Sequence, residues 1–150
     1  MIEVRVSGAD AEAIIKHDDM WAYLTDDGSV ARDDYEIPEA WLNVVAYVDD
    51  VPAAFVCLVP CNYVTSEVHF GVHPEHRERS KELGETLLTW IWDNTQILKL
   101  TAQTHAMPVF DYALSLGFEI EGINAMSFMK DGKLMDQTYL GVKRCLQQQQ

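Results

Sequence analysis

The sequence contains few cysteines, no long apolar run and little positive charge. Its three cysteines, Cys57, Cys61 and Cys145, are odd in number and follow no spacing pattern. Such a set argues against a disulfide framework and for free thiols in a reducing compartment. No stretch of about twenty apolar residues is present, and the N-terminus lacks the basic and apolar regions of a signal peptide. We therefore expect a soluble cytoplasmic protein that is neither secreted nor embedded in a membrane.

Basic residues are scarce throughout the chain. Lysine and arginine total 11 against 24 aspartates and glutamates, which gives a net charge of −13. A surface of this sign repels nucleic-acid backbones and anionic membranes, so neither is expected as a partner. Acidic residues are concentrated in the first third of the chain, where bases are few. This acidic third is either a solvated surface or a region that attracts a cationic amine or a basic partner.

The chain does contain enough apolar material for one core. Hydrophobic residues make up 48% of its 150 residues, which excludes a mainly disordered chain and suits a single domain. We assign this domain to residues 1–146 and expect 147–150 to be a flexible tail. Alternation of apolar residues predicts strands, and helical periodicity predicts helices. The expected strands cover 2–6, 41–48, 53–59, 67–72, 97–102, 124–129 and 135–142, and the expected helices cover 10–17, 21–24, a stretch ending near 94, and 107–116.

The connections between these elements predict how the strands are ordered. Asp49-Asp50 and the run 130–133, with Asp131-Gly132 at its centre, are predicted hairpin turns. The helix ending near Asn94 joins two strands that should run parallel, in a right-handed β-α-β unit. The expected fold class is therefore α/β (α+β): an antiparallel meander, then a parallel β-α-β unit in a mixed sheet, with helices on both faces.

Residues 66–92 show the clearest sign of function. A buried strand is followed by ten residues without an aliphatic side chain, His73 to Glu82, and then by a leucine-rich helix. Free N–H groups and the helix dipole at such a helix start favour an anion. The plain alternative is a strand-to-helix connection whose glutamates simply favour the start of a helix.

This stretch resembles the signature of the GNAT superfamily of N-acetyltransferases, V-x-P-x-x-R/Q-x-x-G-x-G/A before a leucine-rich helix. Val72 and Pro74 match its start, and the phase of the leucines places Arg79, Glu82 and Gly84 at the R-x-x-G-x-G positions. The resemblance implies acetyl-CoA as cofactor, with its pantetheine arm in a gap between two splayed parallel strands. The cofactor-binding residues that it implies are Phe70, Val72, Arg79, Ser80, Lys81, Glu82, Leu83 and Gly84.

Glu82 is the most important departure from that signature, because it replaces the middle glycine. Its carboxylate repels a phosphate group. Arg77, Arg79 and Lys81 offset this repulsion if their side chains reach the same anion.

The catalytic positions match the family less well. Glu67 stands where some members carry the general base, and its alternative is a polar residue near a strand end. The family often carries a tyrosine that acts as the general acid at the position where this chain has Ala113. We take the adjacent Tyr112 as the candidate acid, although one helical residue turns a side chain by about 100°, which would direct it toward the core. The place of an asparagine that often precedes this helix falls near His105 or Ala106. His105 is either a polar substitute for it or an ordinary residue at a helix start.

The pattern of the remaining aromatic, histidine and cysteine residues gives weaker indications of function. Trp21, Tyr23 and Tyr35 are candidates for the wall of an acceptor site or for the core. His69 lies in a strand and the other nearby histidines lie in the connector, so we expect no metal site. Cys57 and Cys61 are expected in the core.

The run 122–142 resembles the ends of acetyltransferase-like proteins encoded by tailed bacteriophages. This resemblance implies a phage or prophage origin, in the host cytoplasm or the virion. Two hypotheses follow: an acetyl-CoA-dependent N-acetyltransferase acting on a small-molecule or protein amine, and a catalytically silent protein that binds phage structural proteins or forms a homo-oligomer.

Overall fold

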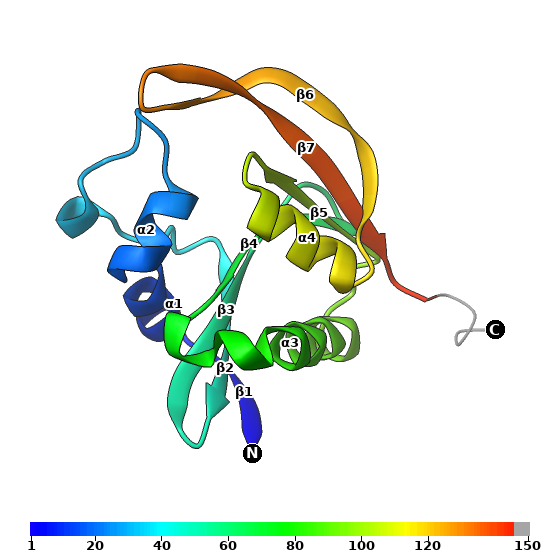
Figure 1. Cartoon of the computed structure of the whole chain (residues 1–150). Helices are drawn as coiled ribbons and strands as arrows, with labels where there is room; N and C mark the ends of the chain where they lie inside the picture. Colours follow the sequence, from blue (N-terminus) through cyan, green and yellow to red (C-terminus); the bar gives the residue numbers. More distant parts are fainter. Residues whose placement is uncertain (146–150) are drawn as a thin grey trace.

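The computed structural model describes residues 1–145, so the predicted tail 147–150 lies outside the described residues. The described residues contain a seven-stranded sheet with the order β1-β2-β3-β4-β5-β7-β6 (Figure 1). Neighbouring strands are antiparallel except β4 and β5, which are parallel. The expected fold class is confirmed. The strands are β1 (Ile2–Val6), β2 (Leu42–Val48), β3 (Val51–Pro60), β4 (Thr65–Val72), β5 (Lys99–Thr104), β6 (Glu119–Lys130) and β7 (Lys133–Lys143), and the helices are α1 (Gly8–Ile15), α2 (Asp18–Leu24), the short 3-10 helices η1 (Arg32–Asp34) and η2 (Pro74–Arg79), α3 (Ser80–Asn94) and α4 (Met107–Ser115).

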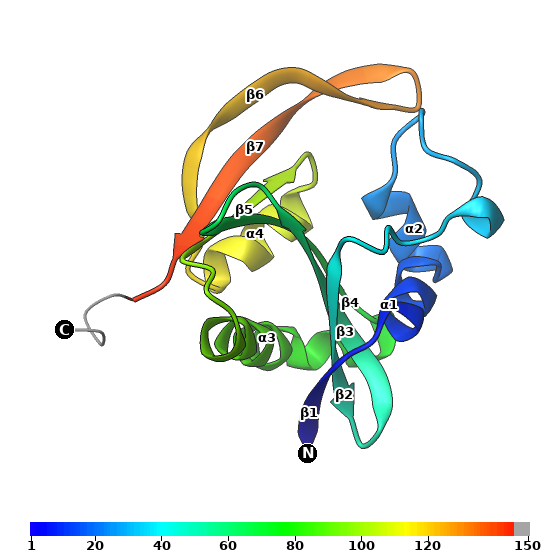
Figure 2. The ribbon, with the colours of Figure 1, turned by 180° about the vertical axis from the view of Figure 1, so that it is seen from behind.

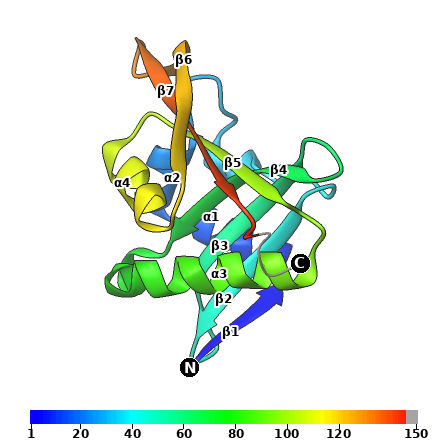
Figure 3. The ribbon, with the colours of Figure 1, turned by 90° about the vertical axis from the view of Figure 1, so that its right-hand side faces the viewer.

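Helices cover both faces of the sheet (Figures 2 and 3). α3 and α4 lie on one face, over a core that includes Leu83, Ile91 and Leu100. α1 and α2 lie on the other face, over a second core cluster that includes Ile14 and Phe55. Because both faces are covered, β2 and β3 are buried along most of their length. This explains why their sequences are nearly continuous apolar runs.

The predicted boundaries of β1 to β5 and of β7 lie within two residues of the observed ones, whereas β6 begins five residues earlier than predicted. The pairing of β6 with β7 changes register between Ile120 and Gly122 and again between Asn124 and Phe128. Each irregularity shifts the side chains that face the core, so the alternation on which the prediction depended is lost.

The polar connector after β4 is not a loop, contrary to the prediction. It forms η2, which runs directly into α3 at Ser80. Pro74 suits the first helical position, and the Nδ1 of His73 accepts a hydrogen bond from the N–H of Glu75 at 3.2 Å. α3 therefore starts at Ser80, two residues before Glu82, where the predicted loop ended.

Both predicted hairpin turns are present. Asp49 and Asp50 have φ values of 49° and 67°, and Asp131 and Gly132 have values of 52° and 76°, as a two-residue type I′ turn requires. The Asp27 carboxylate accepts hydrogen bonds from the N–H groups of Asp131 and Gly132 at 2.8 and 2.9 Å. The tip of the long β6–β7 hairpin is thereby attached to the segment after α2 (Figure 1).

The cysteines divide between core and surface. Cys57 is buried in β3, as predicted, whereas Cys61 is exposed, so that prediction was wrong. The reason is that β3 ends at Pro60 and Cys61 lies in the connection to β4. None of the helices within residues 1–145 is long and apolar enough to cross a membrane.

Candidate active site

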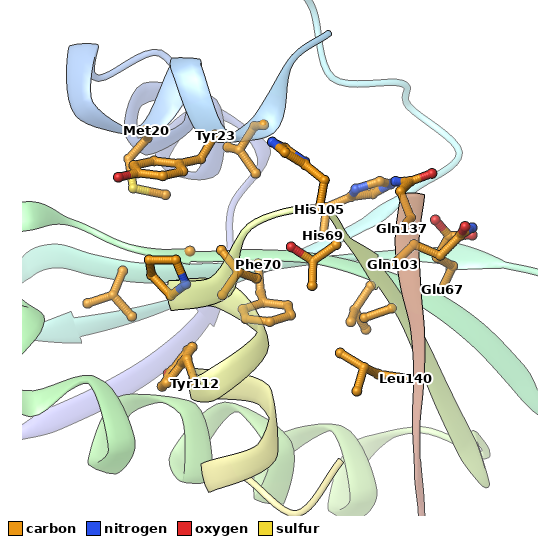
Figure 4. A pocket seen from close by; sticks show the side chains of 18 of the residues that line it. Met20, Tyr23, Glu67, His69, Phe70, Gln103, His105, Tyr112, Gln137 and Leu140 are labelled. Carbon is orange, nitrogen blue, oxygen red and sulfur yellow. The ribbon is translucent and has the colours of Figure 1, made fainter. Parts of the chain in front are cut away.

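The parallel strands β4 and β5 separate soon after they begin to pair. Their register covers only Thr65–Lys99, Ser66–Leu100 and Glu67–Thr101. Beyond this point β5 continues along β7 as far as Thr104, while β4 continues along β3 as far as Val72. A cavity of about 320 Å³ lies where the strands diverge, lined by both of them and by α2 and α4 (Figure 4). Its volume is at the lower end of the range of about 300–1,000 Å³ that is usual for ligand sites.

Alternation along β4 directs different side chains to the two faces of the sheet. Val68, Phe70 and Val72 pack with the core beneath α3 and α4. The Phe70 ring lies 5.7 Å from the Tyr112 ring and 6.4 Å from the Phe118 ring. Phe70 therefore forms the floor of the cavity.

Glu67 and His69 alternate with those core residues on the same strand and also line the cavity (Figure 4). No cation among residues 1–145 forms an ion pair with Glu67. The His69 ring faces the cavity. It also stacks on the Trp41 ring, with 5.3 Å between the two ring centroids. Desolvation by these walls lowers the pKa of His69, and the nearby Glu67 carboxylate opposes that shift only in part.

The predicted phosphate end of the site contains one cation without a carboxylate partner. Arg77 lines the cavity, and its Nη2 lies 3.5 Å from the Sδ of Met20. No ion pair involving Arg77 is present in the described part of the chain. Ser80, the first residue of α3, also lines this end of the cavity. Arg77 therefore combines with a helix start, which favours an anion.

The other two cations of this segment are paired with carboxylates. Both oxygens of Glu82 accept hydrogen bonds from Arg79 at 3.0 Å. This contact lowers the pKa of Glu82 and raises that of Arg79. The Nζ of Lys81 lies 3.9 Å from the Glu85 carboxylate. Arg79 thus neutralises Glu82 instead of standing free for a phosphate.

The structure brings only part of the predicted cofactor set to the cavity wall. Phe70, Val72 and Ser80 line the cavity, together with the predicted catalytic residues Glu67 and Tyr112. The side chains of the remaining five lie elsewhere. Leu83 and Gly84 are buried, Arg79 is half-buried at the end of η2, and Lys81 and Glu82 are exposed in the first turn of α3. Any contact of these five with a cofactor stays a prediction.

Tyr112 fills the junction between α4 and the start of α3. Its hydroxyl donates a hydrogen bond to the Ser80 carbonyl at 2.5 Å. Burial raises the pKa of Tyr112 strongly, the Glu85 carboxylate raises it further, and a hydrogen bond from the Gly84 N–H opposes both. A Cβ at Gly84 would lie 2.4 Å from the tyrosine oxygen and 2.8 Å from the Leu116 methyl groups. Gly84 therefore permits the close approach of α4, whatever its role toward a phosphate.

The acceptor-wall candidates lie in two cavities. Tyr23 lines the cavity between β4 and β5, as does His105, whose ring stacks on Phe128 at 4.1 Å. Trp21 and Tyr35 line a second cavity beside it.

Sequence reasoning considered His69 only as a metal ligand and did not place it in the active site. The signal that was missed is its position two residues after Glu67, which puts both side chains on one face of β4. No group of three or more histidine, cysteine, aspartate or glutamate side chains within residues 1–145 is arranged to hold a metal ion.

Comparison with known proteins supports the fold. No protein-family model matches the chain, and no curated protein sequence matches it. Among solved structures, spermidine N-acetyltransferase from Vibrio cholerae, in complex with CoA and spermine, aligns with a TM-score of 0.76 and 16% identity over 95% of each chain. An acetyltransferase of the GNAT family from Streptococcus pneumoniae aligns with a TM-score of 0.72 and 14% identity over 96% of this chain and 100% of that one.

A Salmonella typhimurium protein solved with its cofactor acetyl-CoA aligns with a TM-score of 0.71 and 21% identity, over 95% of this chain and 94% of that one. At these identities the likeness shows that the chain has the GNAT fold. Nothing in these comparisons supports a phage origin.

Proposed function

We propose that this protein is an acetyl-CoA-dependent N-acetyltransferase that acetylates a small-molecule or protein amine. The observation that carries this proposal is the free edge of β4 along the cavity. One edge of β4 pairs with β3 throughout, but no β5 residue pairs with Val68–Val72 within the described chain. Main-chain N–H and C=O groups need hydrogen-bond partners, and the amides of a pantetheine arm supply them. Phe70 and Val72 are the proposed main-chain contacts.

The phosphates of the cofactor belong, in this proposal, at the start of α3. The first N–H groups of an α-helix have no partner within the helix. After the N-cap residue Arg79, the main chain of Lys81 and Glu82 holds such positions here. Arg77 adds the cation that lacks a carboxylate partner among residues 1–145.

When bound, acetyl-CoA supplies the acetyl group as a thioester. Transfer forms a nitrogen–carbon bond, breaks the carbon–sulfur bond, takes a proton from the amine and returns one to the thiolate. Glu67 is the proposed base because it lines the cavity without an ion-pair partner among the described residues. Tyr112 remains the candidate acid, but its hydroxyl donates a hydrogen bond to the Ser80 carbonyl. It can reach a thiolate only after that hydrogen bond breaks.

A specific observation favours the second candidate, a catalytically silent protein that acts as a binding module through protein contacts. Arg79 is engaged by Glu82, and the Tyr112 hydroxyl is engaged by α3. Both groups are therefore used for internal contacts in the arrangement observed.

Thermal unfolding with and without acetyl-CoA separates these two functions. At 100 times Kd, binding adds about 2.7 kcal/mol to the free energy of unfolding, a rise in Tm of roughly 5–10 °C. Arg77→Gln should reduce this rise. Lys81→Gln is the matched control and should reduce it less, because Lys81 already lies near Glu85. Glu82→Gln should increase the rise, because it frees Arg79. No rise at millimolar acetyl-CoA would contradict the transferase proposal.

A further inference from the structure

A second cavity lies beside the first on the α1–α2 face of the sheet. Its volume is about 270 Å³. Its lining includes Trp21, Tyr35 and Trp41, aromatic side chains from separate parts of the chain, and the Trp21 and Tyr35 rings meet edge to face at 5.6 Å. We call this cavity, with these three residues, the aromatic pocket.

The walls of the aromatic pocket carry no formal charge. Apart from Trp21, Tyr35 and Trp41, its lining is mostly apolar and includes Ile15, Phe55 and Cys57. No Asp, Glu, Lys or Arg among the described residues lines it. Burial raises the pKa of the Tyr35 phenol and raises that of the Cys57 thiol to about 12. Charges are thus disfavoured at the end of the pocket formed by Tyr35 and Cys57.

The aromatic pocket adjoins the cavity between β4 and β5. His69 and Leu24 line both cavities. The His69 ring stacks on Trp41 with an angle of 17° between the ring planes, so the His69 side chain forms part of the partition between the two cavities. Glu67 lies two residues away on the same face of β4 (Figure 4).

The uncharged, aromatic lining of the pocket distinguishes an acceptor with an aromatic ring from one with a second charged group. An ammonium group in the aromatic pocket would lose its hydration without a carboxylate to replace it. Cation–π contact with the rings returns only about 0.5–2 kcal/mol of that loss. An aromatic ring there would gain from burial and from contacts with the three aromatic side chains. A molecule with a ring at one end and an amine at the other matches the chemistry of these two adjoining cavities.

We propose that the aromatic pocket binds the ring of an arylalkyl primary amine, whose nitrogen then lies beyond His69 in the cavity with Glu67. The assignment as an acceptor subsite rests on the proposed transferase function. It predicts that a linear diamine, which has a second charge in place of a ring, is a poor acceptor.

Titration calorimetry on the full chain tests this assignment without any reaction. The probes are 2-phenylethylamine and 1,4-diaminobutane, each measured in the absence of acetyl-CoA. Burial of one ring predicts that 2-phenylethylamine binds roughly ten- to a hundredfold more tightly. With acetyl-CoA present, its kcat/KM should exceed that of the diamine by a similar factor.

One exposed position allows the charge of the aromatic pocket to be changed without disturbing the core. Val30 lines the pocket and is 56% exposed. Val30→Asp should weaken 2-phenylethylamine binding by roughly tenfold and tighten diamine binding. Val51→Asp is the matched control, because Val51 is similarly exposed, at 51%, but does not line the pocket. It should leave both affinities unchanged.

The outcomes separate this inference from the proposed function. If acetyl-CoA raises the Tm but 2-phenylethylamine binds no more tightly than the diamine, the pocket assignment is overturned and the transferase proposal stands. Equal effects of Val30→Asp and Val51→Asp would also overturn the assignment. If acetyl-CoA has no effect while 2-phenylethylamine binds and responds to Val30→Asp, the ring site stands and the transferase proposal fails.

Discussion

At the scale of single residues, Glu67 and His69 enter the same cavity from one face of β4, and each is able to accept a proton from an amine. The lowered pKa of His69 keeps its imidazole neutral near pH 7. Glu67 has no ion-pair partner within residues 1–145. Either side chain can therefore act as the general base.

Glu67→Gln should lower kcat by roughly a hundredfold or more while changing KM little, because a general base typically contributes about 10²- to 10⁴-fold. The measurement is the steady-state kcat and KM at pH 7.5, with His69→Gln as the matched variant. An unchanged kcat in Glu67→Gln, together with a large loss in His69→Gln, would assign the proton transfer to His69.

At the scale of secondary-structure elements, the contact between α3 and α4 sets the shape of the cavity. Gly84 lets the Tyr112 side chain lie against the first turn of α3, where its hydroxyl binds Ser80. A glycine inside a helix costs about 1 kcal/mol relative to alanine. Its presence here is explained by packing, even without a phosphate.

Gly84→Ala should lower the free energy of unfolding, because overpacking, at about 1–3 kcal/mol, costs more than the gain of about 1 kcal/mol in helix propensity. The closest atom to the new Cβ is the tyrosine oxygen at 2.4 Å. The same substitution in a Tyr112→Phe background should therefore cost less. Urea unfolding of the four proteins in this double-mutant cycle measures the difference. An equal cost in both backgrounds would show that the Tyr112 hydroxyl is not the group that conflicts with the Cβ.

At the scale of the whole molecule, three histidines in different elements share a lowered pKa. Desolvation is the largest cause for each of His69, His73 and His105. An unfolded chain titrates these groups near about 6.5, so between that pH and the lowered values it binds more protons than the folded protein. The stability that they contribute is present above about pH 6.5 and is lost as the pH falls through their folded pKa values.

We expect the free energy of unfolding to decrease between pH 7 and pH 5.5, and the decrease to be smaller in a His69→Gln/His105→Gln variant. The reason is that this variant has two fewer groups to protonate on unfolding. Urea titrations in 0.5 M salt measure the effect, because salt screens the self-repulsion of a chain with a net charge of −13. The same pH slope in both proteins would exclude these histidines as its cause.

The sequence by itself determined the elements and their order. Alternation identified β1 to β5 and β7 within two residues, and Asp131-Gly132 identified the last hairpin. These signals are local, because strand alternation and turn chemistry depend on neighbours in the chain. The parallel unit followed from a helix between two strands, and the helix phase placed Gly84 in the first turns of α3.

Only the tertiary structure decided which cations stand free and which cavities exist. The sequence listed Arg77, Arg79 and Lys81 as equivalent, but the fold turns Arg77 toward Met20 and pairs the other two with glutamates. The aromatic pocket joins residues 21, 35, 41 and 69, which come from four separate segments. Contacts of this kind depend on how α2, β2 and β4 pack against one another, and no periodicity within a single segment records that packing.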